Sequence, residues 1–429
     1  MFTNSQDYNK DLFGFLQQSP TAFHTTRTIQ KRLVKAGFKE LDESKGWKLK
    51  PENGYFVVRD NSAICAFTLG KKQIPSDGFR MTASHNDSPG LQIKPVAAIE
   101  SPPYLQLGVE VYGSPLLHQW FDRDLGLAGR VCAKTNAESY QEFLIDFKRP
   151  LLTIPTVAIH LDREANTSKS IDKQKLLPPL LAQKIGDQLP NFHEILLQRI
   201  KKQYPKPKIS KILSFDLFCY DSQAPAFLGL NNEFIAAGRL DNQLSCHAGV
   251  MALCQSSGTM NSMFICTNHE ENGSTSVSGA NSSFVTDIFS RIIPDPEQRY
   301  ISLRNSFLVS MDNAHGVHPN YMELSDPNHS VNLNEGLVIK INANQRYATN
   351  SRSSARFKLI AEKAGVPVQE FVMRSDMPCG STVGPMTAAK LGVDTIDIGV
   401  PTFGMHSIRE ITGSSDPYML YQTIIEFLQ

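Results

Sequence analysis

Apolar side chains recur at helical spacing near both ends of the chain. Over residues 12–16 this spacing predicts a first helix. Ser19 and Pro20 predict the start of a second helix, with the serine as N-cap and the proline as first helical residue, and Gly37 predicts its end. The amphipathic pattern over residues 415–428 predicts a C-terminal helix.

Short apolar runs between these helices predict strands. Residues 55–58 and 63–69 flank a polar turn and predict a hairpin, and residues 79–84 predict another strand. From residue 230 onward, helical segments alternate with strand-like runs at 234–237, 263–267, 307–311, 337–341 and 395–399. Between residues 96 and 225 the apolar runs, including 156–161, are short and β-rich without this alternation. The pattern therefore predicts an α/β domain interrupted by a β-rich insertion.

Composition narrows the class of protein. The 429 residues are 41% hydrophobic, with 43 Lys+Arg against 42 Asp+Glu and a net charge of +1, which favours a globular protein with a large core. This balance argues against a nucleic-acid or membrane partner, because both need a strong positive field. The lysines between residues 201 and 211 are typical of a solvated helix end or loop.

Cysteine spacing and hydropathy indicate the compartment. The seven cysteines are odd in number and form no CxxC pair, which argues against a disulfide framework or a thiolate zinc site and fits a reducing compartment. The chain has neither a signal-peptide pattern nor an apolar run of the ~20 residues that cross a bilayer. We therefore expect a cytoplasmic protein.

Candidate metal ligands and acid–base groups follow the predicted strands of the α/β part. They are His85, Asp87, Asp241, Glu270, Glu271, Asp312 and His406. Open α/β sheets bind ligands beyond the carboxyl ends of their strands, so these groups are expected to meet in one crevice. Imidazole and carboxylate donors suit zinc or a similar divalent ion.

Each of these signals is weak when taken singly. Asp241 is also a plausible N-cap for the helix that follows it, and Glu270 and Glu271 are also typical of solvated surface carboxylates. A single histidine at a strand end is more often structural than a ligand. The metal hypothesis therefore depends on the joint pattern.

Long motifs in a fixed order give the chain a family resemblance. They include SPTAFH at 19–24, ASHNDSPGLQIKP at 83–95, WFDRDLGLAGR at 120–130, GRLDN at 238–242, HEENGS at 269–274, DMPCGSTVGP at 376–385 and MHSIRE at 405–410. In these motifs the chain resembles the M18 metallopeptidases, the aspartyl aminopeptidases. The resemblance implies a hydrolase with a zinc-peptidase-like catalytic domain, a central mixed sheet flanked by helices, formed by residues 1–95 and 226–429. It also implies an inserted β-rich dimerisation domain at 96–225 and a homo-oligomer built from dimers, a dodecamer.

The same resemblance assigns the metal site. His85, Asp241, Glu271, Asp312 and His406 match the ligands of two zinc ions per subunit, for which Co²⁺ or Mn²⁺ are alternatives. Asp241 is expected to bridge the ions, with His85 and Asp312 on one and Glu271 and His406 on the other. Asp87 is expected to hydrogen-bond the His85 imidazole and fix its tautomer.

The resemblance also implies the reaction. Glu270 matches a general base. In the family such a base takes a proton from the water that bridges the metals, which leaves a hydroxide, and passes that proton to the leaving amine. Lys340 matches a lysine facing an acidic side chain of the first substrate residue, and Tyr347 a donor to the substrate or the oxyanion. His315 matches a pocket residue, and His160 a histidine that the insertion delivers to a neighbouring subunit.

The expected function is therefore removal of N-terminal Asp or Glu from peptides by a dinuclear zinc aminopeptidase. A leucine-type or broad aminopeptidase with Lys340 turned away from the pocket is the alternative within the family. A scaffold or cargo-binding protein with a vestigial site is the alternative outside it. Asn268 and Asn272 depart from the family pattern beside the glutamate pair, which leaves the tuning of Glu270 open.

Overall fold

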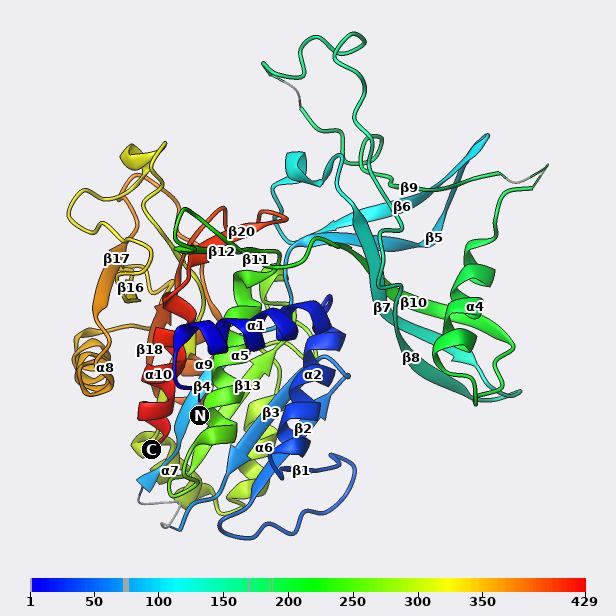
Figure 1. The fold of residues 1–429 in the computed structure, drawn as a ribbon. Helices are drawn as coiled ribbons and strands as arrows, with labels where there is room; N and C mark the ends of the chain where they lie inside the picture. Colours follow the sequence, from blue (N-terminus) through cyan, green and yellow to red (C-terminus); the bar gives the residue numbers. More distant parts are fainter. Residues whose placement is uncertain (1, 72–76, 169, 185, 187) are drawn as a thin grey trace. The chain divides into compact units, whose positions relative to one another are not determined.

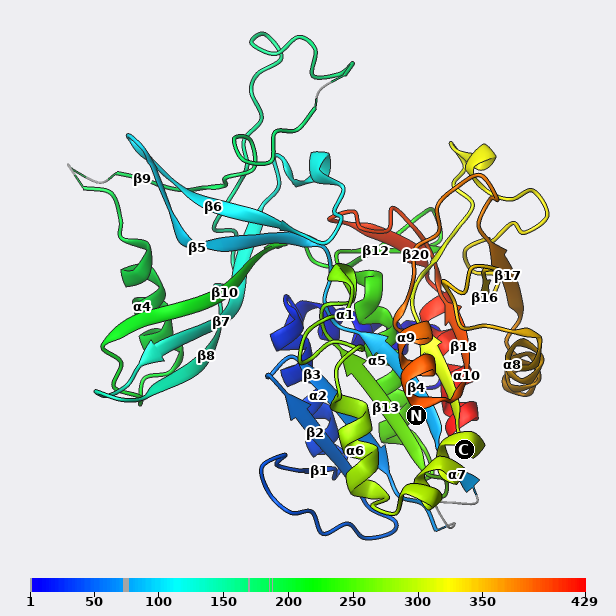
Figure 2. The same ribbon diagram turned by 180° about the vertical axis from the view of Figure 1, so that it is seen from behind.

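A computed structural model describes residues 2–71, 77–168, 170–184, 186 and 188–429. Figures 1 and 2 show the ribbon from opposite sides. The chain forms two compact units, which we describe separately. The larger unit contains Met1–Asp87, Pro225–Met405 and Glu410–Gln429, and the smaller unit contains Ser88–Ala224 together with His406–Arg409.

A nine-stranded mixed sheet forms the centre of the larger unit. In order across the sheet its strands are β1 (Lys39–Glu40), β2 (Gly54–Arg59), β3 (Ala63–Thr68), β13 (Ser262–Thr267), β4 (Arg80–His85), β14 (Phe307–Met311), β18 (Asp394–Gly399), β16 (Leu337–Ile341) and β17 (Val368–Val372). The neighbours β13, β4, β14 and β18 run parallel. Strand β3 is antiparallel to both of its neighbours, whereas β16 is antiparallel to β18 and parallel to β17. Four consecutive carboxyl ends therefore meet at one edge of the sheet.

Helices cover both faces of this sheet because its strands are apolar on both sides (Figures 1 and 2). One face packs against α1 (Ser5–Gln18), α2 (Ala22–Lys35), α5 (Leu240–Gln255), α8 (Ser351–Ala364) and α10 (Asp416–Leu428). The other packs against α6 (Phe284–Ile292), α7 (Pro296–Asn305) and α9 (Val383–Leu391). In β13, Phe264 and Cys266 point to the first face, while Met263 and Ile265 point to the second. The alternation of strand side chains thus builds two cores from one run of residues.

A second, five-stranded sheet belongs to the same unit. Its order is β11 (Ala226–Leu228), β12 (Phe234–Ala237), β20 (Glu410–Gly413), β19 (Pro401–Phe403) and β15 (Ala314–His315). The strand predicted at 234–237 is confirmed, but it pairs with β11 and β20 instead of joining the central sheet. This sheet brings together segments that are distant in the sequence.

The smaller unit contains a six-stranded antiparallel sheet. Its order is β8 (Tyr140–Asp146), β7 (Leu125–Lys134), β10 (Lys211–Asp221), β5 (Gly90–Ser101), β6 (Tyr104–Tyr112) and β9 (Leu180–Gln183). Helix α4 (Phe192–Gln203) packs on it through Phe192, Leu196 and Ile200. Lys201 and Lys202 lie in the last turn of α4, which confirms the prediction of a solvated helix end.

Two local predictions are wrong. Residues 156–161 form no strand but an exposed loop and turn, in which Leu161 is 83% exposed. Ser19 ends α1 by donating its backbone N–H to the carbonyl of Leu16, and the N-cap of α2 is Thr21. The apolar pattern is present at 156–161, but the described chain supplies no partner strand for it. At α2 the capping pattern is present, but the N-cap lies two residues later than predicted.

Gly399, at the end of β18, provides a test of how tightly this edge is packed. A Cβ atom there would overlap the carbonyl oxygen of Asp312 and crowd the backbone of Asn313. We expect Gly399→Ala to lower the free energy of unfolding by about 1–3 kcal/mol, because the backbone next to it must shift. Urea denaturation measures the loss.

The control is Gly14→Ala in α1, where a Cβ would meet nothing closer than Gln18 Nε2 at 4.0 Å. Alanine there should stabilise the helix by about 0.5–1 kcal/mol. Equal effects of the two substitutions would contradict the packing that we describe.

Candidate metal and active site

Three neighbouring strands end in carboxylate or imidazole side chains. His85 is the last residue of β4, and Asp312 directly follows β14. Glu270 and Glu271 lie in the short 3-10 helix η2 (Glu270–Asn272) that follows β13. Thr267, the last residue of β13, pairs with His85, so Glu270 and Glu271 follow at the same end of the sheet as the end of β4. The prediction that strand-end groups converge is confirmed for these four residues.

Asp241 reaches the same place from the other sheet. It follows β12 and occupies the non-helical start of α5, with φ −79° and ψ 109°. Its backbone N–H donates to Glu410 Oε2 at 2.9 Å. Asn242 is also non-helical, so Asp241 lies at the N-terminal boundary of the regular part of α5.

The imidazole of His85 is surrounded by carboxylates. Its Nε2 lies 3.3 Å from Asp241 Oδ1, 3.7 Å from Asp312 Oδ1 and 4.0 Å from Glu270 Oε2. One ligand atom each from His85, Asp241 and Glu271 lies within 4.8 Å of the other two. All of these side chains are buried or nearly so.

This donor set fits a zinc-type ion. Bonds of about 2.0–2.1 Å in tetrahedral geometry hold neighbouring donors about 3.3 Å apart. The separation of His85 Nε2 and Asp241 Oδ1, 3.3 Å, matches that requirement. One nitrogen among several oxygens is also a set that zinc and other borderline divalent ions accept.

The electrostatics of the cluster point the same way. Burial lowers the pKa of His85, but the carboxylates of Asp241, Asp312 and Asp87 outweigh it and raise this pKa well above its ordinary value. Burial raises the pKa of Glu270 to about 8, and the surrounding carboxylates add to the shift against the opposing effect of His85. Both shifts mean that the site stabilises added positive charge, which a divalent cation supplies.

Asp87 connects the ligand segments. Its Oδ1 lies 3.4 Å from His85 Nδ1, and its carbonyl oxygen lies 3.1 Å from the same nitrogen. Its carboxylate also accepts the backbone N–H groups of Glu270 at 3.2 Å and Glu271 at 3.1 Å. Asp87 therefore contacts the imidazole through its carboxylate and its carbonyl oxygen, and it also holds the glutamate turn in place.

Lys340, Tyr347 and His315 lie beside the Asp312 loop. Lys340, only 3% exposed, donates from Nζ to the carbonyl oxygens of Asp312 at 3.2 Å and Asn313 at 2.9 Å. Its Nζ also lies 4.9 Å from the ring centre of Tyr347. Burial raises the pKa of Tyr347 well above its ordinary value, so its hydroxyl keeps its proton. His315 is exposed at the end of β15 and packs edge-on against Phe371.

Two of the predicted site residues belong to the smaller unit. The Nδ1 atom of His406 lies 3.2 Å from the carbonyl oxygen of Ser114. His160 is exposed in the turn that follows Val157 and Ile159. The roles of His406 as a ligand and of His160 in a neighbouring site stay predictions.

The sequence reasoning missed the buried polar residues that support the ligands. Glu410 accepts the Asp241 amide, and Asn86, Asn242 and Gln243 make hydrogen bonds close to the ligands. The available signal was the placement of three of them in the motifs ASHNDSPGLQIKP, GRLDN and MHSIRE beside a predicted ligand. Gln243 follows GRLDN directly and begins the predicted helix, so only its burial distinguishes it.

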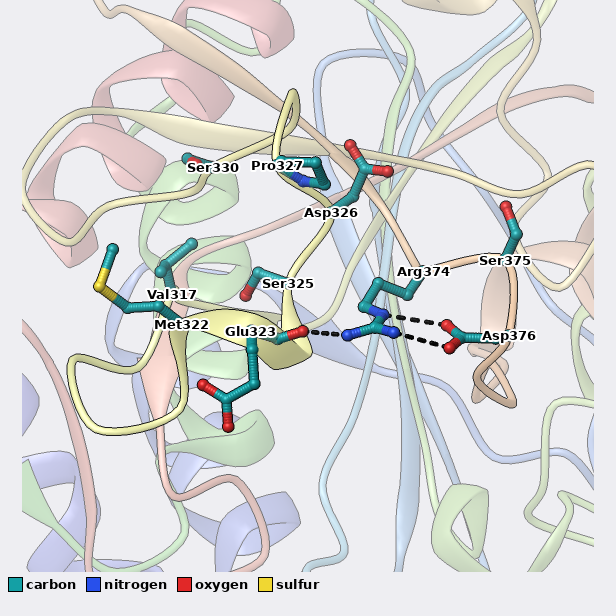
Figure 3. A pocket seen from close by; sticks show the side chains of 10 residues that line it. All are labelled: Val317, Met322, Glu323, Ser325, Asp326, Pro327, Ser330, Arg374, Ser375 and Asp376. Carbon is teal, nitrogen blue, oxygen red and sulfur yellow. Dashed lines mark hydrogen bonds and ion pairs between the residues drawn. The ribbon is translucent and has the colours of Figure 1, made fainter.

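A separate hollow of about 670 Å³ lies between the loops that follow β15 and β17 (Figure 3). Its central cation, Arg374, donates to both carboxylate oxygens of Asp376, at 2.9 and 2.6 Å, and to the carbonyl oxygen of Glu323. Asp326 on its wall pairs with His329 at 2.8 Å. Because these acidic and basic side chains pair with one another, the residues described in this hollow form no group of uncompensated carboxylates like the one around His85.

Comparison with known proteins decides the family. A family model described as Aminopeptidase I zinc metalloprotease (M18) matches residues 15–428. The chain belongs to the M18 family of zinc metallo-aminopeptidases. A probable M18 family aminopeptidase 2 of Azotobacter vinelandii is 46% identical over 421 residues, which cover 98% of each chain. Its counterpart in Ectopseudomonas mendocina is 47% identical over 416 residues, which cover 97% of this chain and 96% of that one.

Solved structures of M18 aminopeptidases share the fold. A chain in the cryo-EM structure of the Ape4 and Nbr1 complex superposes with a TM-score of 0.95 at 38% identity, covering 99% of this chain and 86% of that one. The dodecamer of mApe1 from S. cerevisiae gives a TM-score of 0.85 at 27% identity, covering 98% and 96%. The predicted zinc-peptidase-like α/β fold with a central mixed sheet is thereby confirmed. Within the described residues no helix is long and apolar enough to cross a membrane.

Asp87 tests the geometry of the metal site without removing a ligand. Asp87→Asn places an amide NH₂ where one carboxylate oxygen accepts a backbone N–H of the glutamate turn. We expect zinc affinity to fall about 10–100-fold, as for other outer partners of metal ligands. Competition with a chromophoric chelator measures it.

Asp295→Asn is the matched control. Asp295 also accepts a backbone N–H, that of Gln298 at 2.8 Å, but as the N-cap of α7. Asparagine caps helices as well as aspartate does, so zinc affinity and stability should stay unchanged. Unaltered zinc affinity in Asp87→Asn would contradict the role that we give to Asp87.

Proposed function

We propose that this M18 protein is a dinuclear zinc aminopeptidase that releases an N-terminal Asp or Glu from peptides. The observation that carries the proposal is the carboxylate cluster around His85 together with the buried ammonium of Lys340 on the backbone of Asp312. His85, Asp241, Glu271, Asp312 and His406 would hold two ions. Co²⁺ and Mn²⁺ suit the same oxygen and nitrogen donors.

Zinc, when bound, supplies a Lewis acid and an acidified water for attack on the scissile carbonyl. Glu270 accepts the proton of that water and returns it to the departing amine. Its Oε2 lies 4.0 Å from His85 Nε2, at the rim of the cluster, which suits a general base beside the ligands. Tyr347, which stays protonated, donates a hydrogen bond to the substrate.

Selectivity for acidic residues is assigned to Lys340. An ammonium group has three N–H donors, and two of those on Lys340 serve the carbonyl oxygens of Asp312 and Asn313. Within the described residues the third donor has no further hydrogen bond beside the Tyr347 ring, and we assign it, with the charge, to a substrate carboxylate. In a buried setting such a charge-assisted contact is strong.

The two donated hydrogen bonds also support the alternative of a broad or leucine-type aminopeptidase. In that reading Lys340 only braces the Asp312 loop, and substrates are distinguished elsewhere. The two readings differ in one quantity, the ratio of kcat/KM for acidic and neutral substrates.

The substrate prediction concerns Lys340→Met. We expect kcat/KM for Asp- and Glu-p-nitroanilide to fall about 10- to 150-fold more than kcat/KM for Leu-p-nitroanilide, because a hydrogen bond to a charged group contributes about 1.5–3 kcal/mol. Any decrease in kcat/KM that is equal for all three substrates reflects the loss of the hydrogen bonds from Lys340 to the Asp312 loop. Stopped or continuous nitroanilide assays on zinc-loaded protein give the ratio.

Lys390→Met is the control, because Lys390 also donates to a backbone carbonyl, that of Asn281 at 2.7 Å, outside the site. It should leave the ratio unchanged. An equal loss on all three substrates in Lys340→Met supports the broad aminopeptidase. Release of no N-terminal residue by wild-type protein would overturn both readings, and a lack of bound metal would favour the scaffold alternative.

We further propose that the protein is a homo-oligomer in which the loop around His160 meets a neighbouring subunit. The apolar side chains of Val157, Ile159 and Leu161 are 52%, 47% and 83% exposed in the single chain. Burying such side chains is favourable by about 25 cal/mol per Å². The mApe1 relative is a dodecamer by its description, which supports the same assembly here.

The assembly prediction concerns Leu161→Asp. Light scattering should give the wild type a mass near twelve times 47.7 kDa and the variant a much smaller one. Leu359→Asp is the control, since Leu359 on α8 is 68% exposed and lies outside this loop. A wild-type mass equal to one chain would refute the oligomer and the transfer of His160.

A further inference from the structure

We propose that Asn242 and Gln243 are positioning residues whose carboxamide side chains set the spacing between Asp241 and the strand ends that carry His85 and Asp312. They directly follow Asp241 in the chain and are completely buried. Because Asp241 arrives from the five-stranded sheet, no ladder hydrogen bonds connect its strand to β4 or β14 among the described pairings. Side chains have to make this connection.

Gln243 reaches the end of β4. Its Nε2 donates to the carbonyl oxygen of Asn86 at 2.7 Å, and Asn86 stands between His85 and Asp87. Its Oε1 accepts the hydroxyl of Thr25 at 3.0 Å. With both ends of the amide engaged, the side chain cannot rotate without breaking both hydrogen bonds.

Asn86, the residue that Gln243 contacts, is itself held from three sides. Its backbone N–H donates to the carbonyl of Thr267 at 2.9 Å. Its side-chain Nδ2 donates to the carbonyl of Ser62 at 2.6 Å and to the hydroxyl of Thr26 at 3.0 Å. The carbonyl that Gln243 contacts is therefore a fixed reference point, so a shift of α5 would be transmitted to the His85 segment.

Asn242 makes the corresponding contact on the next strand. Its Nδ2 donates to the carbonyl oxygen of Met311 at 2.8 Å, and Met311 directly precedes Asp312. Strands β4 and β14 are hydrogen-bonded neighbours. Two consecutive carboxamides thus bind two adjacent strand ends, each within one residue of a predicted ligand.

The chemistry of the contacts explains why amides stand here. Each contacted carbonyl is buried and needs a donor, and a carboxamide supplies one without adding a further negative charge beside the carboxylates. Glutamate in place of Gln243 would turn a second oxygen toward the Asn86 carbonyl. An apolar side chain would leave that carbonyl without its donor, at a cost of about 1–3 kcal/mol.

The test uses the full chain and Gln243→Met, which keeps the length of the side chain and removes both polar atoms. We expect the zinc dissociation constant, measured by chelator competition, to rise about 10–100-fold. The visible d–d spectrum of protein loaded with Co²⁺ alone should change in intensity and position, because it reports ligand geometry. These readouts do not depend on which substrate the enzyme prefers.

Gln255→Met provides the control for simple loss of stability. Gln255 ends the same helix and accepts the hydroxyl of Tyr421 at 2.7 Å, far along α5 from Asp241. It should lower the free energy of unfolding and leave zinc affinity and the cobalt spectrum unchanged. If Gln243→Met also leaves both unchanged, its role is structural only and the proposal is overturned.

Asn242→Ala keeps the proposal falsifiable if Gln243→Met does not fold. It removes the donor to Met311 while leaving the Gln243 contacts intact. Weaker zinc binding with an altered cobalt spectrum supports the positioning role, and wild-type values for both overturn it. Failure of the aminopeptidase assays with these metal readouts intact would concern the proposed substrate and not this inference.

Discussion

The main physical constraint on this structure is the electrostatic repulsion among carboxylates that are buried together around the imidazole of His85. Asp87, Asp241, Glu270 and Asp312 lie close to His85 in a part of the protein from which water is largely excluded. Such a group of negative charges costs free energy unless cations compensate for it. The site is therefore organised for metal binding, and the neighbouring polar residues act to hold the carboxylates where repulsion would separate them.

The parallel centre of the nine-stranded sheet does most of this positioning. Strands β13, β4 and β14 are hydrogen-bonded neighbours whose carboxyl ends meet, and apolar layers bury them on both faces. Backbone hydrogen bonds to Asp87 then hold the glutamate turn against the end of β4. Asp241 is the exception, because it comes from the second sheet and is located by Glu410 and the two amides that follow it.

Lys340 has one role that the structure shows, in the Asp312 loop, and one that we propose, in substrate preference. Its ammonium group is buried against the carbonyls of Asp312 and Asn313, so it stabilises the loop that carries a ligand. The same group brings positive charge close to where a substrate is expected. A lysine suits both tasks, since it has three donors and a single compact charge.

The sequence by itself determined the strands at 307–311 and 337–341 and the residue types at the strand ends, because hydrophobic periodicity and turn chemistry are local properties. It also predicted the hairpin over 55–58 and 63–69, each end within one residue of its observed place. The strand predicted at 156–161 is wrong, because its apolar residues have no pairing strand among the described residues. The predicted start of α2 is also wrong. Only the tertiary structure decided that Asp241 arrives from a separate sheet, that Asp87 holds the glutamate turn and that Gln243 meets Asn86 across 157 residues of sequence. These contacts join segments that are distant along the chain, so they follow from sheet order and helix packing, which no local pattern of residues encodes.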